Sequence, residues 1–220
     1  MLKISNLFAG YVNNDFILKD IKLEISKGET LLIIGNNGTG KSTLAKAIIN
    51  NLPEQYGEII FNKNILFNSK KNIKLKTEII INSGIGYFLQ GGRVFPQLTV
   101  EENLFIANNR NPGLNNSKYF NTLKNKFDII LKSGKEKATY LSLGQKHLLA
   151  LAMVLLKDPS FLILDEPTAG LDDKNVEIVT EIITELKNKN DLSILLIEHR
   201  TEEIKSLADR RVEVVDGKIK

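Results

Sequence analysis

The sequence predicts an α/β fold with a mainly parallel sheet, an antiparallel β subdomain at the N-terminus and an inserted helical subdomain. Three observations support this. Short continuous apolar runs alternate with helix-forming segments towards the C-terminus, as in buried parallel strands. β-rich runs separated by turns fill the N-terminal part. A glycine-rich loop, Gly35–Ser42, connects the apolar run Thr30–Ile34 to a helix-forming segment.

The N-terminal elements are predicted from their apolar patterns and turn residues. Ser26–Glu29 is predicted to form a tight turn, and a helix is expected from Lys41 to about Asn50. The region of about 68–138 is rich in Asn and Lys and less regular. The predicted strands of this half are Leu2–Leu7, Phe16–Ile25, Thr30–Ile34, Gly57–Phe61, Ile65–Phe67 and Ile85–Leu89.

The C-terminal half is predicted to be helical first and then to alternate strands with helices. A helical region, Thr99–Leu131, is expected to break near Asn111–Gly113. The elements expected after it are a serine-capped helix Ser142–Leu156, a strand Ser160–Leu164, a helix Lys174–Asn188, a strand Ser193–Ile197 and a hairpin at Asp216–Gly217. We expect one domain over 1–220, in which 1–95 and 151–220 form the core with its β subdomain and about 96–150 forms the helical subdomain.

The composition is that of a soluble globular protein, with 42% hydrophobic and 25% charged residues. The net charge of +4 is spread along the chain, so no nucleic-acid partner is expected. The absence of cysteine excludes disulfides, thiolate metal sites and cysteine nucleophiles. Met1–Val12 has no apolar segment typical of a secretory signal. The longest apolar run, Leu148–Leu156, is far shorter than the about 20 residues that cross a bilayer, so we expect any membrane part to be another chain.

The glycine-rich loop matches the pattern G-x-x-x-x-G-K-[ST] at every fixed position. Its glycines let successive backbone N–H groups point at phosphate oxygens, and the following helix adds the positive end of its dipole. Lys41 is placed to reach the β- and γ-phosphates, and the Ser42 hydroxyl to join a Mg²⁺ shell. A structural turn before a core helix is the alternative. The predicted nucleotide-binding residues are Gly35, Asn36, Asn37, Gly38, Thr39, Gly40, Lys41, Ser42 and Thr43.

A second motif places two carboxylates at the end of a buried strand, in Phe161–Glu166. Ligands of open α/β sheets gather at the carboxyl ends of the strands. Asp165 is therefore expected to hold Mg²⁺, and Glu166 to polarise a water for attack on the γ-phosphate. The alternative is a strand that ends in two solvated acids.

Further motifs resemble those of ABC ATPases. Leu141–Gln145 is similar to that family's signature Leu-Ser-Gly-Gly-Gln, and Asp165–Thr168 followed by Ala169–Asp172 also looks like the family. Gln90 after a strand, His199 after Ile194–Glu198 and Tyr11 before the phosphate loop complete the set in the family's order. The resemblance covers about 1–205 and implies an ATP-binding subunit of an ABC transporter.

The resemblance implies a site shared by two such domains that meet head to tail, with ATP and Mg²⁺ between them. The signature residues Ser142, Leu143, Gly144 and Gln145 would face the partner's ATP, and Asp172 would lie at the dimer seam. Catalytic roles would fall to Lys41, Gln90, Glu166 and His199, and the Mg²⁺ shell to Ser42, Gln90 and Asp165. Tyr11 would stack on adenine, although a core or loop tyrosine is the alternative.

Leu143 departs from the family pattern, because it replaces the first signature glycine. We expect its side chain to face away from the nucleotide. Two other patterns are weaker. Asn188–Asp191 matches a guanine-reading motif but follows a helix, which favours a solvated helix end, and His147 in the signature helix is expected to have a surface or packing role.

The segment Gly91–Leu104 is similar to the corresponding stretch of ATPase subunits of branched-chain amino-acid importers. In ABC transporters this region receives the coupling helix of the membrane subunit, so Val94, Phe95 and Leu98 are candidate docking residues; ordinary packing is the alternative. The main hypothesis is a cytoplasmic subunit, peripheral on the inner face of the cell membrane, with permease subunits and a second nucleotide-binding subunit as partners. The alternatives are a soluble ABC ATPase acting on ribosomes or DNA, and another phosphate-loop enzyme such as a small-molecule kinase.

Overall fold

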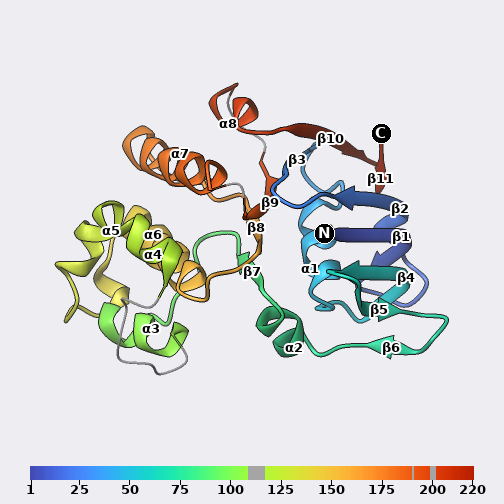
Figure 1. Ribbon diagram of the computed structural model, residues 1–220, viewed down its shortest axis with the longest axis horizontal. Coiled ribbons are helices and arrows are strands. Elements are labelled where there is room, and N and C mark those ends of the chain that lie inside the picture. The colour runs from blue at the N-terminus through green and yellow to red at the C-terminus, as the bar shows by residue number, and fades with distance from the viewer. Residues whose placement is uncertain (109–116, 190, 199–201) are drawn as a thin grey trace.

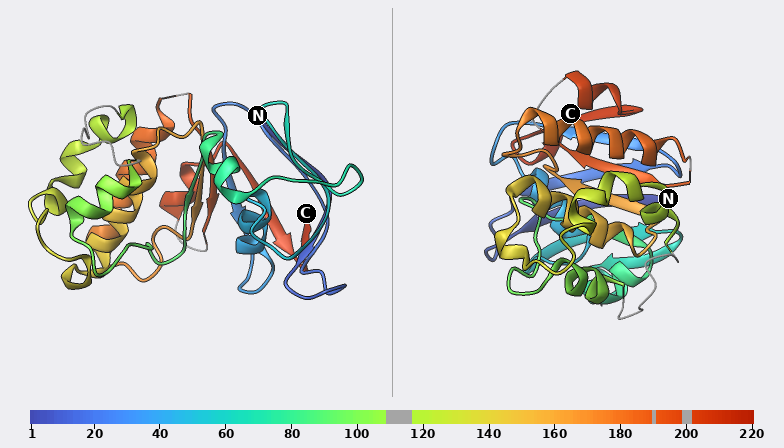
Figure 2. Two further views of the ribbon diagram at one scale, coloured as in Figure 1. Left: turned by 90° about the horizontal axis from the view of Figure 1, so that it is seen from below. Right: turned by 90° about the vertical axis from the view of Figure 1, so that its left-hand side faces the viewer.

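The computed structural model describes residues 1–108, 117–189, 191–198 and 202–220. Two β-sheets lie at one end of the molecule, and a group of helices lies at the other end (Figures 1 and 2). The predicted fold class is confirmed.

The N-terminal sheet is antiparallel and has five strands in the order β2-β1-β4-β5-β6. In β2 the apolar residues alternate with charged ones, so that one face of the strand is buried and the other faces solvent. The strands are β1 (Leu2–Gly10), β2 (Leu18–Ile25), β4 (Glu54–Phe61), β5 (Asn64–Asn68) and β6 (Ile73–Lys74).

The second sheet has the order β11-β10-β3-β9-β8-β7 and is parallel except for the terminal strand β11. Strands β8 and β9 are apolar along most of their length and fully buried, as expected for a sheet covered on both faces. The strands are β3 (Thr30–Ile34), β7 (Ile85–Phe88), β8 (Phe161–Asp165), β9 (Ser193–Ile197), β10 (Arg210–Val215) and β11 (Lys218–Ile219).

Helix α1 (Lys41–Ile48) belongs to a hydrophobic core that joins the two sheets. Leu44, Ala45, Ala47 and Ile48 are fully buried there, together with apolar residues of β1, β3, β8 and β9. The start of α1, directly after the glycine-rich loop, is therefore held against the carboxyl ends of the parallel strands.

The remaining helices pack mainly around a second core. In this core Phe120 and Phe127 stack with ring centroids 5.4 Å apart. Capping boxes fix the first turns of α3 and α6. These elements are α2 (Thr77–Asn82), α3 (Val100–Ala107), α4 (Lys118–Thr122), α5 (Lys124–Leu131), the 3₁₀ turn η2 (Ala138–Tyr140), α6 (Leu143–Leu155), α7 (Asp173–Lys187) and α8 (Glu202–Ser206).

The predicted elements are found, most of them with shifted ends, and four short elements were missed: α2, β6, η2 and α8. Helix α2 and strand β6 fall in the Asn- and Lys-rich region, and α2 buries only Ile80, so its pattern carried little periodic signal. The predicted break at Asn111–Gly113 lies outside the described residues. The hairpin at Asp216–Gly217 is confirmed, since both residues have positive φ (48° and 76°) between β10 and β11.

Candidate nucleotide site

The glycine-rich loop follows β3 and ends at the first residue of α1. Gly40 is the N-cap of α1 in the left-handed region (φ 107°), and Gly35 has φ 146°. A Cβ at Gly35 would lie 2.4 Å from the carbonyl oxygen of Val214 on β10. Only glycine therefore fits where the loop leaves the sheet, and the curled backbone that results is the geometry expected of a phosphate cradle.

Lys41 lies at the centre of this loop and is only 4% exposed. Its Nζ donates hydrogen bonds of 2.9 Å to the carbonyl oxygens of both Gly35 and Asn36. Burial lowers the pKa of Lys41, while the nearby carboxylates of Glu166 and Asp165 oppose this shift. The structure thus keeps a cation beneath the loop in a position to meet phosphate oxygens.

Asp165 ends β8 and is buried, with two hydroxyl groups bonded to its carboxylate. Ser42 Oγ donates to Oδ1 at 2.9 Å, and the Tyr87 hydroxyl donates to Oδ2 at 3.1 Å. Burial raises the pKa of Asp165, and the bonds from Ser42 and Tyr87 counteract this effect. Sequence reasoning missed Tyr87, because only the register of β7 against β8 brings it to Asp165.

A carboxylate and a hydroxyl in direct contact are the hard oxygen donors that Mg²⁺ prefers, so Ser42 and Asp165 fit this ion. Within the described part of the chain, no cluster of three or more His, Cys, Asp or Glu side chains could hold a metal.

Glu166 follows Asp165 with a positive φ of 50°, an uncommon conformation for a residue with a side chain. Its N–H donates to the Ile197 carbonyl oxygen on β9 at 2.9 Å, which holds this backbone in place. Gln90, two residues after β7, donates through Nε2 to the Glu166 carboxylate. The two residues predicted to handle water therefore contact each other.

A polar cleft of about 350 Å³ opens over the loop. Among the described residues, those of the signature segment do not line it. Its lining residues are Ile17, Asn37, Gly38, Gly40, Lys41, Ser42, Thr43, Gln90 and Glu166. The chain thus brings the phosphate loop, Gln90 and Glu166 together in one cleft without the signature.

The signature residues begin helix α6. Ser142 is its N-cap, and its side chain and that of Gln145 form a reciprocal capping box. Gly144 is buried against the side chain of Asn175 at the start of α7. Leu143 is 47% exposed. His147 is 1% exposed and packs with its ring 5.8 Å from that of Phe88, so of the two expected roles the structure shows packing.

Asp172 is the N-cap of α7 and is exposed. Its carboxylate accepts from the Asn175 N–H at 2.9 Å and from Asn175 Nδ2 at 2.9 and 3.0 Å. Asn175 therefore contacts both the Asp172 carboxylate and the signature glycine. Sequence reasoning missed this residue too, since it belongs to none of the motifs.

Tyr11 is not among the residues that line this cleft. Tyr11 is 45% exposed, and its hydroxyl accepts from Lys46 Nζ at 3.0 Å; the same ammonium lies 5.2 Å from the ring centroid. His199 lies outside the described residues.

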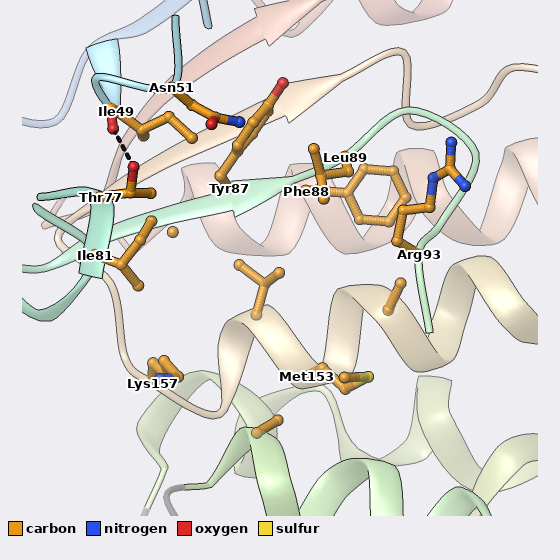
Figure 3. A pocket seen from close by; sticks show the side chains of 14 residues that line it. Ile49, Asn51, Thr77, Ile81, Tyr87, Phe88, Leu89, Arg93, Met153 and Lys157 are labelled. Carbon is orange, nitrogen blue, oxygen red and sulfur yellow. Dashed lines mark hydrogen bonds between the residues drawn. The ribbon is translucent and has the colours of Figure 1, made fainter. Parts of the chain in front are cut away.

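Next to β7 is an apolar pocket of about 400 Å³ (Figure 3). None of the candidate docking residues Val94, Phe95 and Leu98 is among the residues that line it; Val94 and Leu98 are half-buried, and Phe95 is 49% exposed. The lining residues are Ile49, Asn51, Thr77, Ile81, Gly86, Tyr87, Phe88, Leu89, Arg93, Ala107, Ala150, Met153, Val154 and Lys157.

The fold and the loop define a nucleoside triphosphatase of the phosphate-loop class. A family profile described as ABC transporter matches residues 18–169. The chain is 32% identical over 219 residues to a probable branched-chain amino acid transport ATP-binding protein, LivF, of Archaeoglobus fulgidus, covering 100% of this chain and 90% of that protein. The chain belongs to the ABC transporter family, and it is an ATP-binding subunit that hydrolyses ATP.

Two other similarities agree with this assignment. The chain is 32% identical over 223 residues to the ribose import ATP-binding protein RbsA of Bacillus licheniformis, covering 99% of this chain but only 43% of that protein. Its fold matches an ATP-binding cassette solved as a dimer with ADP and Pi, with a TM-score of 0.82, 23% identity and coverage of 100% of this chain and 97% of that one.

Proposed function

We propose that this chain is the energy-coupling subunit of a membrane transporter and works as one half of a head-to-tail ATPase dimer. The observation that carries the proposal is the incomplete cleft: the phosphate loop, Gln90 and Glu166 line it, while the signature at the start of α6 does not. A second subunit that presents Ser142 and Gly144 across the cleft would complete the site. The N-terminus of a capped helix is suited to bind phosphate oxygens.

Within this site each predicted residue has a chemical role. Lys41 and the loop N–H groups bind the β- and γ-phosphates, and Ser42, Asp165 and Gln90 hold Mg²⁺, which neutralises phosphate charge. Glu166 accepts the proton of the attacking water. Its bond to Gln90 places the carboxylate in the cleft before nucleotide arrives. In the same proposal Tyr11 stacks on adenine, His199 contacts the γ-phosphate and Asp172 lies at the seam.

The membrane partner would dock at the apolar pocket beside β7. The pocket is bounded by β7, which leads to Gln90, and by α6, which begins with the signature. Leu89, which is 41% exposed, and Arg93 line the pocket, and Phe95, which is 49% exposed, follows Arg93 by two residues in the sequence. A short amphipathic helix of a permease subunit has the size and polarity for this groove. Among the described residues, no helix of this chain has the length and apolar character to cross a membrane.

The partners we propose are therefore permease subunits and a second nucleotide-binding subunit, with the chain held on the inner face of the cell membrane. The family relation to LivF favours uptake of an amino acid as the transported cargo. The relatives named above carry transport names, which supports this proposal over a soluble ATPase acting on ribosomes or DNA.

The dimer is tested with Glu166→Gln, which keeps ATP binding and removes the general base. We expect a stable dimer by light scattering with ATP and Mg²⁺, and a monomer without nucleotide. A monomer at saturating ATP and Mg²⁺ contradicts the shared site. The transport role is tested by affinity purification from membranes, where co-purification of permease subunits supports it and exclusive recovery with ribosomes overturns it.

A further inference from the structure

Among the residues that the structure describes, Tyr87 is the one whose side chain both lines the apolar pocket and bonds the buried carboxylate of the nucleotide site. Its ring forms part of the pocket wall on β7. Its hydroxyl donates to Asp165 Oδ2 at 3.1 Å. Figure 3 shows the ring rising from β7 with the hydroxyl on the side away from Met153 and Lys157. The pocket and the metal-binding edge of the nucleotide site are thus separated by the width of one aromatic side chain.

The bond from Tyr87 fixes how Asp165 presents its two oxygens. Oδ1 accepts a hydrogen bond from Ser42 Oγ, and Oδ2 accepts one from the Tyr87 hydroxyl. The carboxylate therefore cannot rotate without breaking both hydrogen bonds. Because Asp165 is 2% exposed, water offers little replacement for a lost partner. The orientation of this carboxylate therefore depends on where the Tyr87 ring lies.

The Tyr87 ring is in turn exposed to the pocket that it lines. Tyr87 and Phe88 both line the pocket, but Phe88 is 2% exposed and belongs to the helical core, whereas Tyr87 is only half-buried and packs against the core that joins the two sheets. A group that fills the pocket would press on the ring directly, because the pocket holds about 400 Å³ and is mostly apolar.

We propose that Tyr87 is a positioning residue that transmits occupancy of the apolar pocket to the carboxylate of Asp165 and so sets the affinity for Mg²⁺. The inference rests on the proposed function, since it assumes that a partner fills the pocket and that Asp165 holds the ion. Tyr87 touches neither nucleotide nor water in this role; it acts through Asp165.

The first test measures metal binding and not turnover. The dissociation constant of a non-hydrolysable ATP analogue is determined by calorimetry with EDTA and with Mg²⁺, and the ratio of the two reports the contribution of the ion. Tyr87→Phe keeps the ring and removes only the hydroxyl. We expect the ratio to fall about tenfold, the size of losing one hydrogen bond to a charged group, with the EDTA value unchanged. Tyr56→Phe, on the exposed part of β4, is the matched control and should leave both values unchanged.

An unchanged ratio in Tyr87→Phe overturns the proposal. A loss of affinity that is equal in EDTA and in Mg²⁺ also overturns it, because that result assigns Tyr87 to folding or nucleotide contact. Thermal unfolding of each variant separates these cases.

The second test fills the pocket. Since the chain has no cysteine, Met153→Cys can be labelled at one site with an apolar maleimide after folding. We expect the label to change the Mg²⁺ ratio by on the order of threefold, and to have no effect once Tyr87→Phe is present. Labelled Ile129→Cys, an exposed position on α5, is the control. A label effect that survives Tyr87→Phe, or no effect in either background, refutes the transmission.

Both measurements use the isolated chain, so their failure is distinct from failure to recover permease subunits, which bears on the proposed function alone.

Discussion

Gly144→Ala tests the contact between the signature helix and the loop that carries Asp172. A Cβ at Gly144 would lie 2.4 Å from Cγ and Oδ1 of Asn175 and 2.5 Å from its Nδ2, whereas ordinary contacts begin at 3.4 Å. The amide must therefore retreat by about 1 Å (3.4 minus 2.4), which strains its bonds of 2.9 and 3.0 Å to the Asp172 carboxylate. Overpacking of this kind costs about 1–3 kcal/mol of unfolding free energy.

The assay is urea unfolding of four proteins: wild type, Gly144→Ala, Asn175→Ala and the double variant. Asn175→Ala alone should cost about 0.5–1.5 kcal/mol, because it removes partly exposed hydrogen bonds. In the double variant the added methyl group meets no amide, so the cost of Gly144→Ala should largely vanish. Lys174→Ala, an exposed neighbour on α7, should combine additively with Gly144→Ala. If the Gly144 and Asn175 changes are strictly additive, the two residues are not in the contact described above.

Three further outcomes are expected. Lys41→Ala should lose nucleotide affinity, because the buried ammonium under the loop is removed; unchanged ATP binding by calorimetry would remove the loop from its assigned role. Leu143→Gly should change ATP turnover by less than about tenfold, because the Leu143 side chain is 47% exposed and lies beside Gly170; a rise of an order of magnitude would show that this side chain obstructs the nucleotide site. Burial lowers the pKa of His147 below 6.5, so the unfolded state binds the proton first and stability should fall as pH drops below about 6.5, by at most about 1.4 kcal/mol per pH unit; His147→Phe should unfold with a smaller loss over that range.

Local patterns predicted most of the elements that build the site. The loop Gly35–Ser42 and the acids Asp165 and Glu166 are contiguous motifs, and the structure brings them into contact through Ser42 and Asp165. Contiguous motifs are readable because each encodes its own turn, cap or strand end. The order of strands in the sheet cannot be predicted in this way. Strand β3 lies between β9 and β10, and no local sequence pattern indicates this order. It follows from how the sheets bury their apolar faces.

Tyr87 and Asn175 show why the remaining residues could not be predicted. Tyr87 lies 78 residues from Asp165 in sequence, and only the parallel register that pairs Tyr87 with Ile163 brings its hydroxyl to the carboxylate. A half-buried tyrosine in an apolar strand is otherwise typical of packing. Asn175 follows Asp172 by about one helical turn, so its bond to the capping carboxylate of Asp172 is local. Its contact with Gly144 depends instead on how α7 packs against the start of α6.

Two contacts in this ATPase link elements that lie far apart in the sequence. Some residues of the contiguous motifs contact partners within the same loop, as Lys41 does with Gly35 and Asn36. Tyr87 and Asn175 instead connect surfaces that belong to different elements: the apolar pocket to Asp165, and the signature glycine to Asp172. Because each of these contacts is made by one side chain, we expect conservative substitutions at the two positions to alter the contact between the surfaces and to leave the phosphate loop intact.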